Sequence, residues 1–421
     1  MKVLVVGSGG REHAICWAIK KSPKVTDLYC APGNGGIREI AHCVDVKATD
    51  IPGMVTWAKE HCIDFVMVAP DDPLAMGMVD AMEAAGIRAF GPRANAAIVE
   101  GSKAFSKELM KKYGIPTATY EIFTDKDAAL AYVEAQGAPI VVKCDGLALG
   151  KGVIVAQTLE EARAAVISMM ENRAFGEAGA KVVIEECMTG PEVTVLAFTD
   201  GKTIVPMPSS QDHKRAYDGD QGPNTGGMGA ISPCPNYTAE DAKICMNTIF
   251  LPTIQALNAE GRTFQGVIYF GMMLTPQGPK VVEYNARFGD PECQAVLSLL
   301  ETDLMDILEA CVDGTLDQVD VIFRDAASCC LVLASGGYPI AYEKGKEITG
   351  LDHVTDAVVF HAGTKKQDGT FFTNGGRVLG VTAVAPTLRQ AVDKAYAQAK
   401  PVSFEKMHFR TDIGYHILDA K

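Results

Sequence analysis

The first hundred residues alternate short apolar runs with helical stretches, and this alternation limits the possible folds more than any other feature. Strands joined through helices run in parallel, because the helix returns the chain to the starting edge of the sheet. The pattern therefore predicts a parallel, Rossmann-like α/β sheet with helices on both faces. The expected strands are residues 3–6, 28–31, 65–69 and 89–90, and the expected helices are residues 12–20, 53–61 and 73–85.

Glycine-rich and polar segments follow the first strands of this sheet, where open parallel sheets bind their ligands. The first, GSGGREH at residues 7–13, opens a helix whose backbone N–H groups suit a phosphate. It resembles the dinucleotide-binding fingerprint, but Glu12 stands where the third glycine is needed, and no acidic residue ends the second strand. The segment favours a monophosphate over a nicotinamide or flavin cofactor, and a purely structural turn is the alternative.

The net charge and the cysteine content of the chain limit the classes of partner that it can bind and the compartment in which it can act. Its 421 residues suffice for two to four domains. The 39 Lys and Arg against 52 Asp and Glu give a net charge of −13, which argues against a nucleic-acid or membrane-surface partner. No stretch approaches the ~18 apolar residues of a membrane span. The 12 cysteines contain no CxxC pair, which is typical of reduced thiols. These features predict a cytoplasmic protein that acts on small molecules.

A lysine and a glycine-rich loop end an apolar strand in the middle of the chain. Residues 118–188 read as strand, helix, strand, glycine loop, strand, helix and strand. The second of these strands ends at Lys143, just before the loop at residues 146–152. The P-loop order GxxxxGK[ST] is missing, and no helix follows directly. The loop can instead fold over a triphosphate as a lid with Lys143 beneath it; a solvated lysine at a strand end is the alternative.

Two later strands carry groups suited to a nucleotide and its metal ion. The first ends in Glu185 and Glu186, and a carboxylate there can accept a hydrogen bond from an adenine amino group. The period of two along the second strand places Glu283, Asn285 and Arg287 on one face. A carboxylate and an amide oxygen suit Mg²⁺, and an arginine beside them can neutralise a transferring phosphoryl group. A salt-bridged edge strand is the alternative.

A long polar segment at residues 209–229 has no helix or strand pattern of its own. Such structureless stretches inside a compact domain are usually functional or disordered. Side-chain donors at His213, Lys214, Asn224 and Thr225, together with bare glycine amides, suit a phosphorylated sugar. The segment therefore predicts a binding loop.

These clusters, in this order after a parallel α/β domain, resemble the ATP-grasp superfamily. The motifs GSGGREH, APGNGG, EGSKAFSKELM, KCDGLALGKGV, SSQDHKRAYDGDQGPNTGGMG and EYNARFGDPE resemble those of its phosphoribosylamine–glycine ligase family. The resemblance covers essentially the whole chain. It implies an N-terminal α/β substrate-binding domain (residues 1–101), an ATP-grasp domain (102–325) with a mobile lid subdomain at about 118–190, and a small C-terminal α+β domain (326–421).

The resemblance also implies which residues contact ATP and its metal ion. The family usually carries Glu where this chain has Asp71, and an aromatic residue at Cys187. Carried over by position, Lys103 and Lys143 would contact phosphate under the lid residues Gly146, Gly150, Lys151 and Gly152. Adenine would contact Glu185, Glu186 and the Met188 backbone, and the ribose would contact Glu192. The ligands implied for Mg²⁺ or Mn²⁺ are Glu283 and Asn285.

For the phosphoribosyl substrate, the resemblance implies Gly9, Gly10, Asp212, His213, Lys214, Asn224, Thr225, Gly226 and Gly227, with Arg287, Asp290 and Lys143 at the reacting groups. The implied activity is ligation of glycine to 5-phosphoribosylamine, with ATP converted to ADP and phosphate. A carboxylate oxygen cannot leave unaided, so ATP would first convert glycine to glycyl phosphate. Work of this kind is positioning and charge neutralisation, and it needs no Ser or Cys nucleophile.

The oligomeric state is expected to be a monomer or a weak homodimer. Three alternatives to the implied function stay open. Another ATP-grasp ligase or carboxylase would share the middle of the chain but not the segment 209–229. A nicotinamide oxidoreductase would need the third glycine of the fingerprint. A regulator that binds a nucleotide without catalysis would release no ADP.

Overall fold

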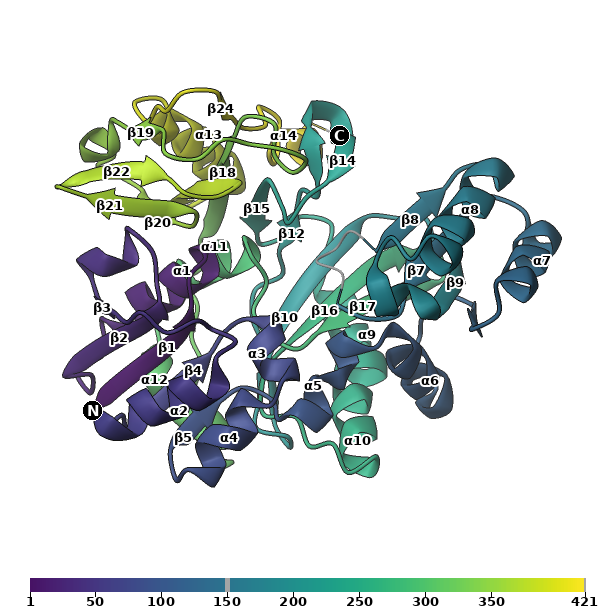
Figure 1. Cartoon of the computed structure of the whole chain (residues 1–421), viewed down its shortest axis with the longest axis horizontal. Coiled ribbons are helices and arrows are strands. Elements are labelled where there is room, and N and C mark those ends of the chain that lie inside the picture. The colour runs from purple at the N-terminus through teal and green to yellow at the C-terminus, as the bar shows by residue number, and fades with distance from the viewer. Residues whose placement is uncertain (148–151, 420–421) are drawn as a thin grey trace.

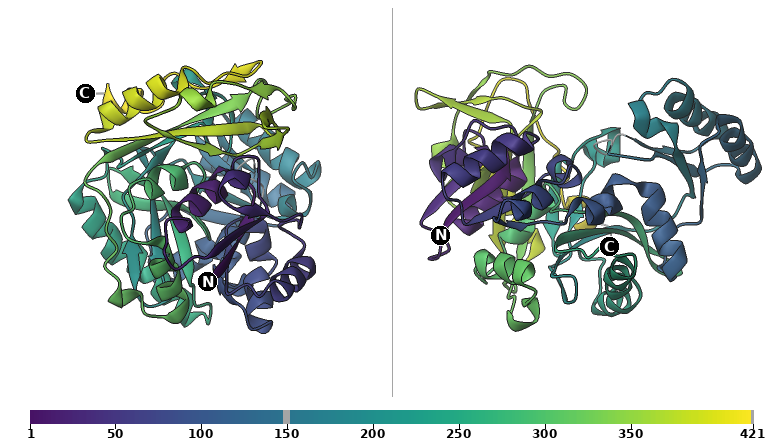
Figure 2. Two further views of the ribbon diagram at one scale, coloured as in Figure 1. Left: turned by 90° about the vertical axis from the view of Figure 1, so that its left-hand side faces the viewer. Right: turned by 60° about the horizontal axis from the view of Figure 1, so that its bottom comes forward.

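The computed structural model describes residues 1–147 and 152–419 of the chain. Figure 1 shows the N-terminal sheet beside the C-terminal sheet, with a separate lobe that projects from the body. The second view of Figure 2 shows the same lobe standing away from the rest of the molecule. The lobe carries β6–β9 with helices α7 and α8, which is the segment predicted to be the lid subdomain.

The N-terminal sheet is parallel, in the order β3-β2-β1-β4-β5, which confirms the predicted architecture. Along β1, Val3 and Val5 belong to one buried cluster and Leu4 and Val6 to another, so both faces of the sheet are covered. The elements are β1 (Lys2–Gly7), α1 (Gly10–Ile19), β2 (Asp27–Pro32), β3 (His42–Cys43), α2 (Ile51–Glu60), β4 (Phe65–Val68), α3 (Asp71–Ala75), α4 (Met78–Ala84), β5 (Arg88–Phe90) and α5 (Ala94–Gly101).

The single helix predicted at residues 73–85 is wrong, because the chain forms two helices there. Gly77 separates α3 from α4 and adopts a left-handed conformation with φ 87°. A residue in that conformation ends the regular helical hydrogen-bonding pattern, and glycine adopts it at little cost. The apolar periodicity of the segment continues across the break, which is why the pattern read as one helix.

The middle of the chain forms two antiparallel sheets that face each other across a cleft. The lobe sheet has the order β6-β9-β7-β8, and the body sheet has the order β11-β10-β16-β17. The strand and helix order predicted for residues 118–188 is confirmed. The lobe contains β6 (Tyr120–Phe123), α7 (Lys126–Gln136), β7 (Ile140–Cys144), β8 (Val153–Ala156), α8 (Leu159–Val166) and β9 (Val182–Glu186). The body contains α6 (Lys103–Tyr113), β10 (Glu192–Thr199), β11 (Ile204–Pro206), α9 (Ala239–Cys245), α10 (Leu251–Ala259), β16 (Gly266–Thr275), β17 (Gly278–Asn285), α11 (Glu292–Leu297) and α12 (Leu304–Asp313).

Residues 209–229 are not structureless, which corrects the prediction. They contain β12 (Gln211–Asp212), β13 (Arg215–Tyr217) and β14 (Gln221–Asn224), and β15 (Gly229–Ser232) begins at their end. Strands β12 and β15 join the C-terminal sheet, in the order β12-β15-β18-β23-β20, whereas β13 pairs with β14 alone. These strands are two to four residues long, which is too short to show an alternating apolar pattern, so no periodicity predicts them.

The C-terminal sheet is covered by helix α13, whose buried face includes Ala391, Val392 and Ala395. Across the described residues, none of the helices has the length and apolar character needed to cross a bilayer. The remaining elements are β18 (Ala327–Ser335), β19 (Glu347–Ile348), β20 (Val358–His361), β21 (Thr364–Gln367), β22 (Thr370–Thr373), β23 (Arg377–Ala385), α13 (Leu388–Ala399), β24 (Met407–His408) and α14 (Tyr415–Leu418).

Candidate active site

Lys143 lies buried at the end of β7 and is paired with Glu185 on the neighbouring strand β9. Its Nζ is 2.9 Å from Glu185 Oε1 and donates to the Val282 carbonyl at 3.2 Å, which links the lobe to β17 of the body. The other Glu185 oxygen lies 3.0 Å from Nζ of Lys107 on α6. Burial lowers the pKa of Lys107 to about 8, although Glu185 opposes that shift. Two lysines thus share one buried carboxylate, and the sequence analysis did not foresee Lys107.

Lys103, at the start of α6, reaches the start of the glycine loop. Ser102 caps this helix by accepting from Phe105 N and also donates to Asp145. The Lys103 Nζ donates to the Gly146 carbonyl at 3.0 Å. Gly152 closes the loop, since its carbonyl accepts from Cys144 N at 2.9 Å. The predicted loop residues Gly150 and Lys151 lie outside the described residues.

The acidic residues after β9 differ in exposure. Glu186 is exposed and accepts from Thr119 N at 2.9 Å, which contributes to a lowered pKa for this carboxyl. Met188 is half-buried, and Glu192 is exposed at the start of β10. These three residues and Glu185 lie at the connection between the lobe strand β9 and the body strand β10.

The face of β17 carries Glu283 and Asn285, with Arg287 directly beyond the strand, as the period of two predicts. Glu100, at the end of α5, holds the other two residues. Its Oε1 lies 2.7 Å from Arg287 Nη2, and its Oε2 accepts from Ala286 N. The Asn285 amide lies 3.1 Å from Oε1, and because a carboxylate oxygen can only accept, the amide is assigned with its nitrogen toward Glu100. Because the amide nitrogen is engaged, the Asn285 oxygen is the group available to a cation. The sequence analysis did not identify Glu100.

Glu283 lies among four cations. Burial alone would raise the pKa of Glu283, but Lys214, Lys143, Lys103 and Arg287 together hold it below its usual value. The carboxylate is therefore ionised at neutral pH in a positively charged surrounding. An anionic ligand such as a triphosphate would be attracted to the same place.

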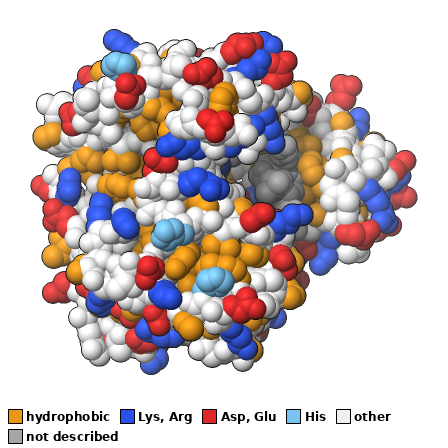
Figure 3. All heavy atoms as spheres, turned by 60° about the vertical axis from the view of Figure 1, so that its left-hand side comes forward, with side chains coloured by type: hydrophobic (Ala, Val, Ile, Leu, Met, Phe, Trp, Pro, Cys, Tyr) orange, Lys and Arg blue, Asp and Glu red, His pale blue; other side chains and the backbone are white. Residues whose placement is uncertain are grey.

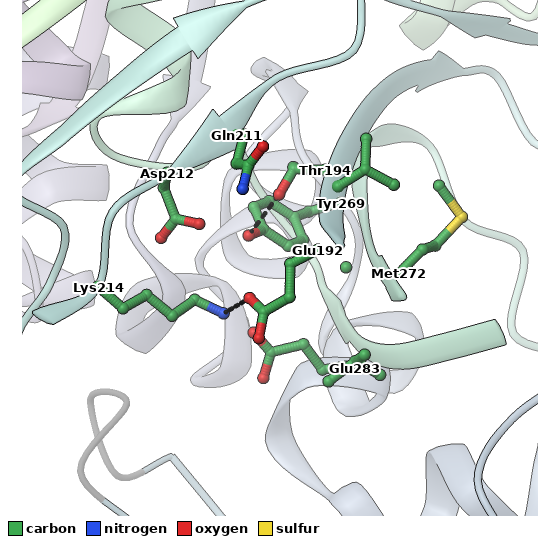
Figure 4. Close-up of a pocket in the computed structure, with 11 residues that line it drawn as sticks. Glu192, Thr194, Gln211, Asp212, Lys214, Tyr269, Met272 and Glu283 are labelled. Carbon is green, nitrogen blue, oxygen red and sulfur yellow. Dashed lines mark hydrogen bonds and ion pairs between the residues drawn. The ribbon is translucent and has the colours of Figure 1, made fainter. Parts of the chain in front are cut away.

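A small cavity lies between β10, β16 and β17 and the segment after β12 (Figure 4). Glu192, Asp212, Lys214, Tyr269 and Glu283 all line it. Lys214 Nζ approaches Glu192 Oε2 at 3.3 Å, and Figure 4 shows both beside Glu283. Burial raises the pKa of Asp212 to about 7, with Lys214 opposing. The charge of Glu192 raises the pKa of Lys214. Asp212 and Lys214, predicted for the sugar phosphate, thus share a cavity with the predicted metal ligand Glu283.

A chain of hydrogen bonds forms the floor of this cavity. Thr194 donates to the Tyr269 hydroxyl at 2.9 Å, and Tyr269 donates to Glu292 Oε1 at 3.0 Å. Glu292 is buried, and burial raises its pKa. Tyr269 and Glu292 come from β16 and α11, and nothing in the sequence pattern separated them from ordinary core residues.

The loop after β1 is occupied by its own glutamate. Glu12 accepts from Gly9 N at 2.5 Å and pairs with Arg11 at 2.7 Å, so a carboxylate fills the position where a dinucleotide phosphate would bind. The Arg11 guanidinium donates to the Phe288 carbonyl, and its backbone N–H reaches Asp290 at 3.4 Å. The loop therefore binds the end of the β17 segment, and Gly10 packs closely against Gln294.

A second, larger cavity of about 490 Å³ lies between the N-terminal loop and the C-terminal sheet. Ser8, Gly9, Asn34 and Asp290 line one side of it, and Tyr338, Thr364, Asn374 and Arg377 are among the residues of the other. Arg377 Nη2 lies 3.4 Å from Asp290 Oδ2. Burial would raise the pKa of Asp290, but Arg377 and Arg11 hold it low. The sequence analysis did not identify the cavity residues that the C-terminal domain contributes.

The rest of segment 209–229 is held by backbone contacts within the segment and with the C-terminal domain. His213 is buried, with Nδ1 facing the Gly229 carbonyl at 3.3 Å and Nε2 accepting from Gly414 N at 3.1 Å. Thr225 closes the β13–β14 hairpin, because its N–H and hydroxyl both donate to the Lys214 carbonyl. Arg377 donates to the carbonyls of Gly226 (2.7 Å) and Gly227 (3.4 Å), beside Asn224 at the end of β14.

The surface around the cleft is basic despite the negative net charge. Figure 3 shows a hollow between the body and the projecting lobe, with Lys and Arg side chains gathered on the body beside it. Among the described residues no cluster of three or more His, Cys, Asp or Glu side chains could hold a metal ion by itself. A cation here would need ligands from a nucleotide, as Mg²⁺ commonly does.

Three family profiles match successive parts of the chain. They are the phosphoribosylglycinamide synthetase N domain at residues 1–100, its ATP-grasp (A) domain at 101–293 and its C domain at 328–416. The phosphoribosylamine–glycine ligase of Halalkalibacterium halodurans is 50% identical over 415 residues, which cover 98% of this chain and 96% of that protein. That of Rhizobium meliloti is 50% identical over 99% of this chain and 98% of its own length.

Solved structures give the same result. The crystal structure of phosphoribosylamine–glycine ligase from Thermotoga maritima matches with a TM-score of 0.86 and 32% identity, over 98% of this chain and 100% of that chain. The biotin carboxylase domain of Hydrogenobacter thermophilus 2-oxoglutarate carboxylase, solved with MgADP and bicarbonate, has a TM-score of 0.74 at 16% identity, over 99% of this chain and 98% of that chain. This second likeness is one of fold alone.

Proposed function

Because the chain belongs to the phosphoribosylamine–glycine ligase family, we propose that the cleft between its two middle sheets activates glycine with ATP for transfer to 5-phosphoribosylamine. The chain is an ATP-dependent ligase of purine biosynthesis, and its products are glycinamide ribonucleotide, ADP and phosphate. The observation that carries the proposed location is the small cavity that Glu283 lines together with Glu192 and Lys214. Lys214, Lys143, Lys103 and Arg287 hold the pKa of Glu283 low there, against the effect of burial.

ATP would lie between the lobe and β17. Lys103 and Lys143 converge there from α6 and β7 and would contact its phosphates under the glycine loop. Adenine would lie along the edge formed by Glu185, Glu186 and Met188, with the ribose at Glu192. The electrostatic surroundings support this placement, since buried lysines favour a polyanion.

ATP-grasp enzymes use ATP with a divalent metal ion, and Glu283 and Asn285 would hold Mg²⁺ or Mn²⁺ here. Both offer hard oxygen ligands from one strand face, and Glu100 orients the amide so that its oxygen is free to bind. The donor set therefore fits such an ion, with the nucleotide phosphates supplying further ligands. The bound ion would neutralise charge that develops on the transferring phosphoryl group.

The phosphoribosyl substrate would occupy the 490 Å³ cavity, which Gly9 lines. Gly10 and residues 224–227 would supply further contacts, and Arg377, which also lines the cavity, donates to the carbonyls of Gly226 and Gly227. Support comes from Asn374 and Arg377 on its walls and from Asp290, which lines this cavity a few residues beyond β17. The amine would then approach along the strand that bears Arg287. Asp212, His213 and Lys214 would connect the two sites.

The chain's own residues suit a direct phosphoryl transfer. Arg287 would hold the glycine carboxylate, which attacks the γ-phosphorus of ATP to give glycyl phosphate and ADP. The amine, oriented by Asp290, then attacks the carbonyl carbon, the C–O bond breaks and phosphate departs with the bridging oxygen. Closure of the lobe would exclude water, which would otherwise hydrolyse the intermediate.

We also propose that the protein acts in the cytoplasm as a monomer or weak homodimer. All 12 cysteines are free thiols and nine are buried, which suits a reducing compartment. The acidic net charge disfavours nucleic-acid and anionic membrane partners.

Release of ADP, measured with each substrate omitted in turn, tests the proposed function. The complete mixture should release ADP, and omission of glycine or of phosphoribosylamine should reduce the rate to background. Release that is indifferent to glycine would instead indicate another ligase of the same fold. Binding of ATP without any release would indicate a regulator.

A further inference from the structure

Lys214 owes its position in the small cavity to a distant part of the chain. Its two sequence neighbours are both bound by residues 408–414, which form the segment that we call the C-terminal strap. The ring of His213 accepts from Gly414 N at 3.1 Å, and the Arg215 carbonyl accepts from Arg410 Nη1 at 3.2 Å. Lys214 is thus anchored on both sides by a segment almost two hundred residues away.

Arg410 is the centre of this anchorage. It is fully buried, and its guanidinium forms a two-point contact with Asp412 at 2.7 and 2.8 Å. A further bond to Asp220 at 2.9 Å reaches across to the β13–β14 hairpin. A buried guanidinium with several charged partners is rigid, because each donor is fixed by the planar fork.

The rest of the strap binds the same hairpin. Thr411 donates to Asp218 through both its backbone N–H and its hydroxyl. Asp412 accepts from Gly219 N at 2.9 Å. The His408 ring lies 2.7 Å from the Ala216 carbonyl and packs edge-on against Tyr217. In Figure 1 the strands of the hairpin lie beside α14, next to the end of the chain.

The hairpin needs this support, because it has little core of its own. Strands β13 and β14 pair only with each other, and a two-stranded hairpin is marginally stable in water. Of the residues 215–222, only Ala216 is buried. The hairpin closes on Lys214 through Thr225, so disorder in the hairpin would reach the lysine directly.

We propose that the C-terminal strap positions Lys214 for the ligation, and that Arg410 is the positioning residue through which it acts. The inference rests on the proposed function of the cleft, since Lys214 shares its cavity with Glu283 and Glu192. The small C-terminal domain therefore contributes to the position of Lys214 in the small cavity as well as to the wall of the larger cavity.

A double-mutant cycle between Arg410 and Lys214 tests the proposal. Arg410→Gln should lower kcat/KM by roughly 10- to 100-fold, the loss expected when an active group is displaced by about 1 Å. Arg410→Lys keeps the positive charge but loses the planar guanidinium. Its kcat/KM should therefore lie between those of Arg410→Gln and the wild type. In a Lys214→Met background, Arg410→Gln should have little further effect, because the group that it positions is already gone.

Arg389→Gln provides the matched control. Arg389 is an exposed arginine of the same domain that pairs with Asp419 and lies over the Tyr415 ring, rather than bonding to the hairpin as Arg410 does. Its loss should leave kcat/KM unchanged in both backgrounds. Thermal unfolding midpoints of every variant show whether the protein folds. If Arg410→Gln does not fold, Thr411→Val replaces it in the cycle. This substitution removes one exposed contact to Asp218, so a smaller decrease in kcat/KM is expected.

If Arg410→Gln lowered kcat/KM by the same factor in the wild-type and Lys214→Met backgrounds, the strap proposal would be overturned. A purely structural role of Arg410 would be independent of Lys214. Activity of Arg410→Gln equal to that of Arg389→Gln would overturn the proposal as well. Failure of the proposed function is distinguished by the wild type itself, which would then show no glycine-dependent release of ADP.

Discussion

Glu283→Gln is expected to lower turnover by about 10³-fold or more, equivalent to a loss of roughly 4 kcal/mol of transition-state stabilisation. The substitution keeps the shape of the side chain but removes the only carboxylate that we assign to the metal ion. Lys214, Lys143, Lys103 and Arg287, which hold the pKa of Glu283 low, would then lose one nearby negative charge. Because the glutamine can still pack in place, the fold and the binding of the phosphoribosyl substrate should be largely retained.

The measurements for Glu283→Gln are the rate of ADP release at increasing Mg²⁺ and the binding of Mn²⁺ with ADP, followed by electron paramagnetic resonance. Mn²⁺ binding should weaken together with the rate. Glu301→Gln is the control, since Glu301 is a surface carboxylate paired with Arg324. Turnover close to that of the wild type, with unchanged Mn²⁺ binding, would remove Glu283 from the metal site.

Lys143→Ala should lower kcat/KM for ATP by about 10²- to 10³-fold, which is typical when a preorganised charge at the reacting phosphate is lost. The fold should survive, because Lys107 still neutralises the buried Glu185 when Lys143 is absent. A buried carboxylate with no partner would be far more damaging to stability. The decrease in kcat/KM should be large for ATP and smaller for glycine.

Steady-state kinetics for each substrate and a thermal unfolding midpoint check the Lys143 prediction. The control is Lys112→Ala, which removes an exposed lysine of α6 that pairs with Glu260. If Lys143→Ala produced ADP as fast as the control, Lys143 would not belong to the ATP site. If it failed to fold, the buried triad would have to be assigned a mainly structural role.

The sequence predicted the parts of the site that lie on single strands. The period of two placed Glu283 and Asn285 on one face of β17, and the structure has them there. The parallel N-terminal sheet and the order of elements in the lobe followed from apolar runs and turns. Such local patterns survive folding because the backbone fixes the direction of successive side chains.

The sequence could not predict partnerships between remote elements. Glu100, Lys107 and Glu292 are ordinary helix residues until folding brings Arg287, Glu185 and Tyr269 beside them. The hairpin at residues 215–224 was missed for the same reason, since much of its support comes from the strap at residues 408–414.

The alternatives left open by the sequence differ in how they fit the structure. In the N-terminal loop, Glu12 occupies the Gly9 N–H that a dinucleotide would need, which argues against a nicotinamide enzyme. The biotin carboxylase domain matches at 16% identity, which is a likeness of fold alone. The relatives that are 50% identical over nearly the whole chain are phosphoribosylamine–glycine ligases.

Transfer of heavy oxygen from glycine to phosphate tests the proposed chemistry most directly. If the glycine carboxylate attacks the γ-phosphorus, one of its oxygens bridges carbon and phosphorus in glycyl phosphate. That oxygen must leave with the phosphate when the amine attacks the carbonyl carbon. Glycine labelled in its carboxylate should therefore pass one label to inorganic phosphate per turnover, detected by mass spectrometry. Unlabelled phosphate, or labelled AMP among the products, would contradict the acyl-phosphate mechanism.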